Sequence, residues 1–206
     1  MSNEPVTRAE LAQLQLSGDS GELSLVPLDT AVLRASARPI SPEALGSVEL
    51  GNVVAAMWRT LDVLGNGVGL AAPQVGLPYQ LFCLDDHEGH RFALANPARI
   101  GLPCLERLED TEGCLSVPGF WGRVRRPAEL TVRGFAPTGE ELEVHGAGFV
   151  ARILAHETDH LLGRLYLDLA LPGTFAPEDP ASLPGGFIFY APKVRTRGRL
   201  RASQGG

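Results

Sequence analysis

Two histidines four residues apart, with a glutamate beside the first, have the types and spacing of a metal site. They are His156, Glu157 and His160 in the segment "ILAHETDHLLG". Residues four apart on a helix lie on one face, one turn apart, so both imidazoles can bind one ion. In this H-E-x-x-H arrangement the histidines bind a divalent cation, and the glutamate takes the proton of a bound water. The segment therefore predicts part of a catalytic metal site.

The alternative is that both histidines lie by chance on a solvated helix face. The apolar residues around the motif argue against it, because imidazoles without partners are costly to bury. These residues are Phe149, Ile153, Leu154, Leu161 and Leu162. A mostly buried helix favours the metal site.

A catalytic site normally has three protein ligands and one open position, so two histidines are too few. The candidates for the third ligand are Cys83, Cys104, Cys114, His87, His90 and His145. Spacing does not choose among them. Local chemistry favours Cys114, because Gly113 before it lets the backbone come close to another group. Cys83 lies in an apolar strand pattern typical of the core, and Cys104 lies in an expected loop.

A glycine-rich segment, "GNGVGLAAPQVG", covers Gly65–Gly76. A dinucleotide-binding loop follows a strand and opens a helix, whereas these glycines follow a helix and Pro73 blocks a new one. A flexible turn is one interpretation. The other is an extended segment against which a peptide backbone can lie, as in strand addition.

Helices and antiparallel hairpins are expected to position these residues. One helix is predicted from Ser41, as N-cap, to Leu64, where glycines follow, and another from near Ala147 to Gly163. Two hairpins are predicted, formed by residues 79–84 with 91–96 and residues 129–135 with 140–146. Together they predict an α+β fold, with antiparallel sheets packed around the H-E-x-x-H helix.

Length and composition indicate one globular domain. The chain has 206 residues, of which 44% are hydrophobic, which is enough for one sizeable core. Its formal net charge of −6 argues against a protein that binds nucleic acid over its whole surface. It contains no run of about 18 apolar residues that would span a membrane. The N-terminal residues lack the pattern of a signal or transit peptide, so the expected location is cytoplasmic. Three cysteines do not suggest a disulfide framework.

We divide the chain into three parts. Residues 1–22 are polar and weakly patterned, and we expect a loosely ordered N-terminal extension, although "RAELAQLQL" could form a short helix. Residues 23–172 are the predicted catalytic domain. Residues 173–206 form a Pro/Gly-rich extension that ends in a basic tail.

Three segments together resemble the motifs of the peptide deformylase family. They are "GVGLAAPQ" (Gly67–Gln74), "EGCLS" (Glu112–Ser116) and "HETDH" (His156–His160), in the family's order. The resemblance covers most of the chain. It implies a metal-dependent hydrolase that removes the N-formyl group from the N-terminal formylmethionine of new polypeptides and releases formate. It also implies one divalent ion, usually Fe²⁺, for which Zn²⁺, Ni²⁺ or Co²⁺ can substitute.

The resemblance assigns roles residue by residue. The implied metal ligands are Cys114, His156 and His160. The implied catalytic groups are Glu157 as the base, with Gln74 and the backbone N–H of Leu115 as donors to the formyl oxygen. The implied substrate-binding residues are Gly67, Val68, Gly69, Phe149 and Ile153. Asp159 could orient a ligand histidine, pair with an arginine such as Arg126, or lie on the helix surface as a solvated carboxylate. Ala155 departs from the glutamine that the family often has there.

The partners follow from the resemblance and from the end of the chain. The substrates are N-formylmethionyl nascent peptides. In the basic tail, cationic residues alternate at Lys193, Arg195, Arg197, Arg199 and Arg201, which could contact ribosomal RNA. The alternative is a solvated end that aids solubility.

Three rival interpretations stay open at this point. A zinc endopeptidase shares H-E-x-x-H but does not need "EGCLS". A catalytically silent binding protein would keep the fold, yet a structural metal site has no use for Glu157 as a base. A specialised paralogue within the family would carry the same motifs.

Overall fold

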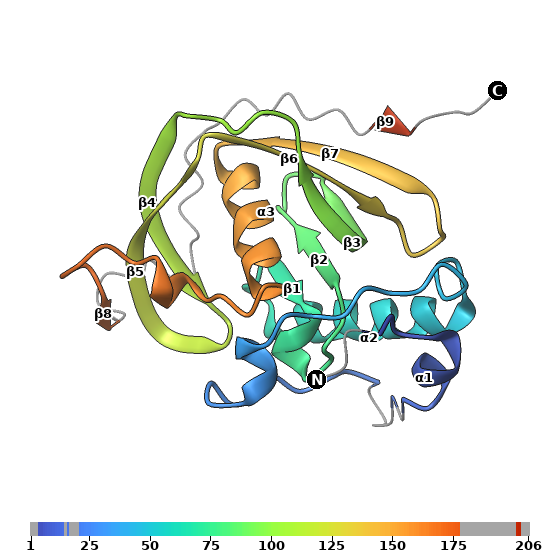
Figure 1. Ribbon diagram of the computed structural model, residues 1–206. Coiled ribbons are helices and arrows are strands. Elements are labelled where there is room, and N and C mark those ends of the chain that lie inside the picture. The colour runs from blue at the N-terminus through green and yellow to red at the C-terminus, as the bar shows by residue number, and fades with distance from the viewer. Residues whose placement is uncertain (1–3, 15, 17–20, 178–200, 203–206) are drawn as a thin grey trace.

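Helix α3, Phe149–His160, carries the H-E-x-x-H segment and lies between two antiparallel sheets (Figure 1). The computed structural model describes residues 4–14, 16, 21–177 and 201–202. Among these residues, α3 packs against strands of both the six-stranded and the three-stranded sheet. The mixed helical and antiparallel architecture confirms the predicted α+β class.

The larger sheet has the order β1-β2-β3-β6-β7-β9, and each neighbouring pair is antiparallel. Its strands in chain order are Gly69–Ala71, Leu81–Asp85, Arg91–Ile100, Glu129–Phe135, Glu141–Ala147 and Arg201–Ala202. The hairpins β2–β3 and β6–β7 confirm the two predicted strand pairs. Strand β1 is at an edge, so one side of its backbone has no strand partner in the described part of the chain.

The smaller sheet consists of β4, β5 and β8, and its long hairpin curls around one side of α3 (Figure 1). The strands are Arg107–Cys114, Val117–Pro127 and Ala176–Pro177. This hairpin was not predicted from the sequence. The one buried residue of β4 is the charged Glu112, so the strand lacks the apolar alternation by which a half-buried strand is recognised.

Helix α2, Val48–Leu64, starts later than predicted. Ser47, not Ser41, is its N-cap, and the Ser47 hydroxyl accepts a hydrogen bond from the Leu50 N–H at 3.2 Å. Gly46 before it has φ +77°, which a continuous helix from Ser41 could not contain. The helix ends at Gly65, which adopts the left-handed conformation as expected. None of the described helices has the length and apolar character needed to cross a membrane.

The N-terminal extension is packed where the structure describes it. Residues 4–14 include α1, Arg8–Ala12, in which Leu11 is buried in the core that α2 covers. Val6 is fully buried and forms a parallel bridge with Ile40. These two apolar side chains dock residues 4–14 on the core, and the short helix lies within the segment "RAELAQLQL" where it was considered. The boundaries of the three parts of the chain stay a prediction.

Two apolar clusters position α3 and the strands around it. One lies between α2 and the larger sheet and includes Leu50, Met57 and Leu81. The other lies between that sheet and α3 and includes Phe82 and Leu154. In the described part of the chain, short 3-10 helices lie at Ala31–Arg34, Ala72–Val75 and Tyr166–Asp168.

Candidate active site

The two histidines of α3 meet a cysteine from the hairpin β4–β5. His160 Nε2 lies 3.2 Å from His156 Nε2 and 3.3 Å from Cys114 Sγ. Three tetrahedral ligands at metal–ligand distances of about 2.0–2.3 Å lie about 3.3–3.7 Å apart, so these spacings fit a single ion. His160 Nδ1 is buried and has no hydrogen-bond partner among the described residues.

The surroundings act differently on the two rings. Burial, together with the charge of His156, places the pKa of His160 well below its ordinary value, which favours the neutral ring that binds metals. Burial also acts to lower the pKa of His156, but Cys114 and Glu112 outweigh it and raise the pKa. A histidine binds a metal ion only as the neutral ring, so an ion in the cluster would compete with the proton on His156.

Cys114 is brought to the histidines by the end of β4. The register of β4 and β5 shifts between Glu112 and Cys114, where the hairpin turns. A Cβ on Gly113 would lie 2.7 Å from the Trp121 ring, so the close approach expected at this glycine is an approach to that ring. Within the described residues, the cluster of possible metal ligands contains Cys114 and not the other five candidates, which are Cys83, Cys104, His87, His90 and His145.

Glu112 holds His156 from the opposite side of its ring. Its carboxylate accepts two hydrogen bonds from Arg126, at 2.8 and 2.9 Å, and one from Arg152 at 2.6 Å. Its Oε2 lies 3.1 Å from His156 Nδ1. Burial alone would raise the pKa of Glu112, but the hydrogen bonds and charges of Arg126 and His156 lower it well below the ordinary range. An ionised Glu112 fixes the ring with Nε2 turned to the cluster.

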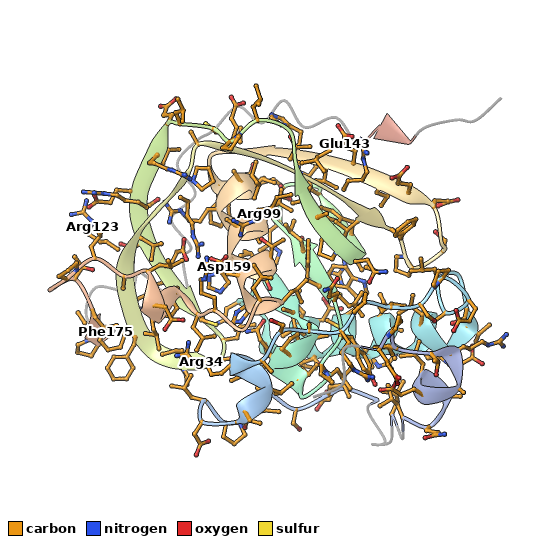
Figure 2. All side chains as sticks on the ribbon, viewed as in Figure 1. Arg34, Arg99, Arg123, Glu143, Asp159 and Phe175 are labelled. Carbon is orange, nitrogen blue, oxygen red and sulfur yellow. The ribbon has the colours of Figure 1, made fainter. Side chains whose placement is uncertain are left out.

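Asp159 and Arg126 form a second buried ion pair behind the Cys/His/His cluster. Arg126 donates to Asp159 through Nη1, while its other nitrogens donate to Glu112. Asp159 also accepts a hydrogen bond of 2.9 Å from Arg99, and Figure 2 labels both side chains. The expected pairing of Asp159 with Arg126 is therefore confirmed. Arg126 connects α3 to β4 through one guanidinium group.

Glu157 is enclosed beside the cluster. It is 3% exposed, and its Oε2 has no hydrogen-bond partner in the described part of the chain. Burial raises the pKa of Glu157 to about 7, although the charge of His156 acts to lower it. A divalent cation nearby would favour the ionised form and lower this pKa. A carboxyl group that ionises near neutrality is suited to exchange protons with a substrate.

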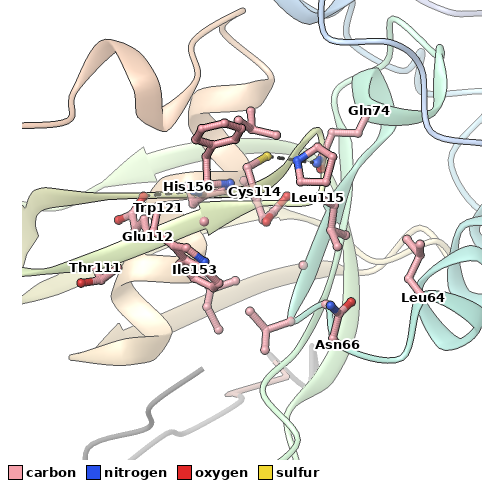
Figure 3. Close-up of a pocket in the computed structure, with 18 of the residues that line it drawn as sticks. Leu64, Asn66, Gln74, Thr111, Glu112, Cys114, Leu115, Trp121, Ile153 and His156 are labelled. Carbon is pink, nitrogen blue, oxygen red and sulfur yellow. Dashed lines mark hydrogen bonds and ion pairs between the residues drawn. The ribbon is translucent and has the colours of Figure 1, made fainter. Parts of the chain in front are cut away.

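Gln74 reaches the cluster from the 3-10 helix after β1. Its Oε1 accepts a hydrogen bond of 2.8 Å from the Ala71 N–H, which orients the amide. Its Nε2 then points to Ser116 Oγ at 3.2 Å and to Cys114 Sγ at 3.5 Å, and Figure 3 shows Gln74 facing Cys114. Leu115 follows Cys114 and lines the same pocket.

A cavity of about 460 Å³ opens onto the cluster. Its wall includes all five residues expected to bind substrate, which are Gly67, Val68, Gly69, Phe149 and Ile153. Most of the surface is apolar, and the polar residues of the wall include Gln74, His156 and Glu157. A largely apolar chamber with a few polar groups is typical of a pocket that buries an apolar side chain.

A Cys/His/His cluster with a buried glutamate beside it, at the wall of a cavity, is typical of metal-dependent hydrolases. The family model described as "Polypeptide deformylase" matches residues 23–173. The chain therefore belongs to the peptide deformylase family.

Individual proteins similar to this chain carry the same family name. The chloroplastic/mitochondrial peptide deformylase 1A of Arabidopsis thaliana is 34% identical over 198 residues, which cover 88% of this chain and 69% of that protein. Peptide deformylase 2 of Pseudomonas syringae pv. tomato is 43% identical over 146 residues, which cover 67% and 80%. The Met-Ala-Ser-bound structure of a class I type b peptide deformylase from Acinetobacter baumannii has a TM-score of 0.67 at 33% identity, covering 71% of this chain and 98% of that one.

The family assignment gives the reaction and a cofactor in general terms. The enzyme is a hydrolase of protein biosynthesis that removes the N-formyl group from nascent peptides. The family implies a metal ion, and the Cys/His/His cluster is a possible site for it.

Sequence reasoning missed Arg152, which lies one turn before His156 on α3. Its guanidinium donates to Glu112 and to the backbone carbonyls of Leu108 and Val124, so it joins the helix to both strands of the hairpin. The spacing of four between Arg152, His156 and His160 was a signal that these side chains share a face. Glu112 was named in the sequence only as a member of the "EGCLS" motif, and its contact with His156 was not predicted.

Proposed function

We propose that Cys114, His156 and His160 hold the metal ion and that Glu157 is the base of the deformylation. The observation that carries this proposal is the convergence of the three ligand atoms, all within 4.8 Å of one another, beside a carboxyl group buried in the cavity wall. A bound divalent ion supplies a Lewis acid that makes water more acidic and polarises the formyl group. We infer Fe²⁺, the family's usual ion; the Cys/His/His donor set also suits Zn²⁺.

Glu157 moves the protons of the reaction. Its carboxylate takes a proton from the attacking water, whose oxygen then bonds to the formyl carbon. When the C–N bond breaks, Glu157 gives the proton to the departing amine, so the products are formate and a free methionine amino group. Proton transfer by a positioned carboxyl group typically contributes about 10²–10⁴ in rate.

Gln74 and Leu115 bind the formyl oxygen. The Gln74 Nε2 donor is oriented by the hydrogen bond from Ala71, and the Leu115 N–H adjoins Cys114. Both can donate to the oxygen while negative charge develops on it. Removing one such donor typically raises the barrier by about 3–4 kcal/mol.

The cavity and the edge strand bind the peptide. Val68, Phe149 and Ile153 provide apolar walls for the methionine side chain. Gly67 and Gly69 adjoin the open edge of the larger sheet, where the backbone of an extended peptide can add as a further strand. The peptide would then lie with its N-terminus at the cluster.

Formate release from formyl-Met-Ala-Ser by metal-loaded protein tests the activity. We expect formate with wild type, loss of at least about 10² in kcat for Glu157→Ala, and no cleavage of internal peptide bonds. Bound metal, measured by elemental analysis after anaerobic purification, should stay in Glu157→Ala. Near-native turnover by this variant would show that another group is the base, and internal cleavage would favour an endopeptidase.

Cysteine variants test the third ligand. Cys114→Ser should release the metal, whereas Cys104→Ser and Cys83→Ser should keep it, because neither residue belongs to the cluster. Chelator competition measures the affinity of each variant. If Cys104→Ser loses the metal and Cys114→Ser keeps it, the third ligand is Cys104 and the proposed assignment of Cys114 is wrong.

We also propose that the basic tail contacts the ribosome in the cytoplasm, where formylated nascent chains emerge. Most of the tail, residues 193–200, lies outside the described residues, and the argument rests on its charge alone. Phosphate contacts release counterions, so co-sedimentation with ribosomes should weaken roughly tenfold or more between about 50 and 200 mM salt. Deleting residues 193–206 should abolish co-sedimentation with ribosomes and leave formate release intact. Equal sedimentation of both forms would contradict this role.

A further inference from the structure

Gly69 and Glu157 are in close contact across the wall of the cavity. A Cβ built on Gly69 would lie 2.2 Å from Glu157 Oε1, 2.6 Å from its Cδ and 3.0 Å from its Cγ. Carbon and oxygen atoms that are not bonded approach no closer than about 3 Å, so an alanine at 69 and the present position of the carboxyl group exclude each other. The glycine is required here for the space that it leaves.

The backbone conformation of Gly69 does not by itself require glycine. Unlike eleven other described glycines, Gly69 does not have positive φ, and it lies in a regular strand paired with Leu84. Any residue can adopt such an extended conformation. The contact with Glu157 is therefore the steric reason for glycine at this position.

Neither backbone can move cheaply to relieve the contact. Strand β1 is held by β2, in which the Asp85 N–H donates to the Val68 carbonyl at 2.9 Å. Helix α3 is held by its buried apolar residues and by the ion pairs of Asp159. The end of the Glu157 side chain is the part that can give, since it moves by rotation about single bonds.

We propose that Gly69 is a positioning residue for Glu157: its missing side chain creates the recess in which the carboxyl group lies at the reaction centre. The proposal rests on the assignment of Glu157 as the base and adds a second role to Gly69 besides pairing with the peptide. An added methyl group pushes the carboxyl group out of the recess and misplaces the base by more than the tolerance of proton transfer.

The two roles of Gly69 predict different kinetics. Alanine keeps the backbone N–H and C=O with which a peptide pairs, so substrate binding should change little. A displaced base weakens an interaction needed in the transition state, which lowers kcat. We expect Gly69→Ala to lower kcat at least about tenfold and to change KM less than about twofold, with metal content unchanged. Gly51→Ala is the matched control, because nothing lies within 4 Å of a Cβ there.

A crystal structure of Gly69→Ala gives a readout apart from activity. We expect the main chain of β1 and α3 to stay in place and the Glu157 carboxyl group to turn away from residue 69. Wild-type kcat, or a loss confined to KM, or an unmoved carboxyl group would overturn the proposal. If wild type releases no formate, the proposed function fails, whereas the carboxyl displacement still decides the role of Gly69.

A second variant covers the case in which Gly69→Ala folds poorly. Glu157→Ala removes the atoms that the new methyl group would meet. We therefore expect Gly69→Ala/Glu157→Ala to melt at the same temperature as Glu157→Ala. A lower melting temperature of the double variant would mean that the methyl group clashes with something else, which contradicts the proposal.

Discussion

The two faces of helix α3 are held by different kinds of contact. Toward the larger sheet the helix presents Val150 and Leu154, which are buried in an apolar cluster with Phe82 and Leu94. Toward the hairpin β4–β5 it presents charged groups that pair with Glu112 and other buried charges.

Apolar packing places the helix without fixing the direction of any one side chain. Dispersion and hydrophobic contacts depend weakly on orientation, so similar shapes can replace one another at a small cost. Hydrogen bonds between ions are directional, and a guanidinium fork fits a carboxylate in one plane. The apolar face therefore gives the helix its position, and the charged face gives His156 its orientation.

Substitution of Arg126 should have the largest effect on this charged face. Arg126→Met leaves Asp159 with Arg99 and the more distant Arg164, and Glu112 with Arg152 and His156. Removing one partner of a buried ion pair typically destabilises a protein by about 3–5 kcal/mol. Metal affinity should also fall by about 10–100-fold, because His156 loses its rigid support. Urea unfolding and chelator competition measure the two effects; unchanged metal affinity would show that Glu112 needs no help to orient the ring.

Substitution of Leu154 should affect stability without affecting the metal. Leu154 is fully buried on the apolar face, and Leu154→Ala removes packing that typically stabilises by about 2–5 kcal/mol. The charged face is left intact, so chelator competition should give a wild-type metal affinity. A loss as large as that in Arg126→Met would mean that the two faces are not separable.

Acid should act on the charged face through Glu112. Its pKa is lowered in the folded enzyme, so its contribution to stability is present above the ordinary glutamate pKa of about 4.5 and is lost as the pH falls below it. The effect should be smaller than that of Arg126→Met, because it concerns Glu112 alone, whereas Arg126→Met removes a partner of both Glu112 and Asp159. Urea unfolding between pH 3 and pH 7 should show this loss in wild type and a flatter profile in Glu112→Gln. If wild type and Glu112→Gln lose stability equally as the pH falls, a group other than Glu112 causes the acid sensitivity.

The smallest effect is expected from an exposed arginine on the same strand. Arg125 pairs with Glu109 at 3.0 Å, but its side chain is 63% exposed. Exposed ion pairs contribute about 0–1 kcal/mol, so Arg125→Met should barely change the urea midpoint or the metal affinity. A change close to that of Arg126→Met would mean that burial is not what separates the two arginines.

The sequence by itself determined what depends on local spacing. The four-residue interval of His156 and His160 puts both rings on one side of a helix, whatever the helix packs against. The β2–β3 and β6–β7 hairpins were predicted from alternation and turn residues, because both signals are local. For Asp159 the sequence offered a histidine, an arginine such as Arg126 or solvent as partners, and it did not choose among them.

Only the tertiary structure decided which distant groups meet. Cys114 and His160 are separated by 46 positions, and several other cysteines and histidines had equal claims from spacing. The charged strand β4 has no apolar pattern, so neither the hairpin nor the Glu112 network was visible in it. The recess at Gly69 exists because one strand crosses beside one helix at a particular distance. Contacts of this kind depend on how whole elements pack, and residue spacing along the chain does not specify that packing.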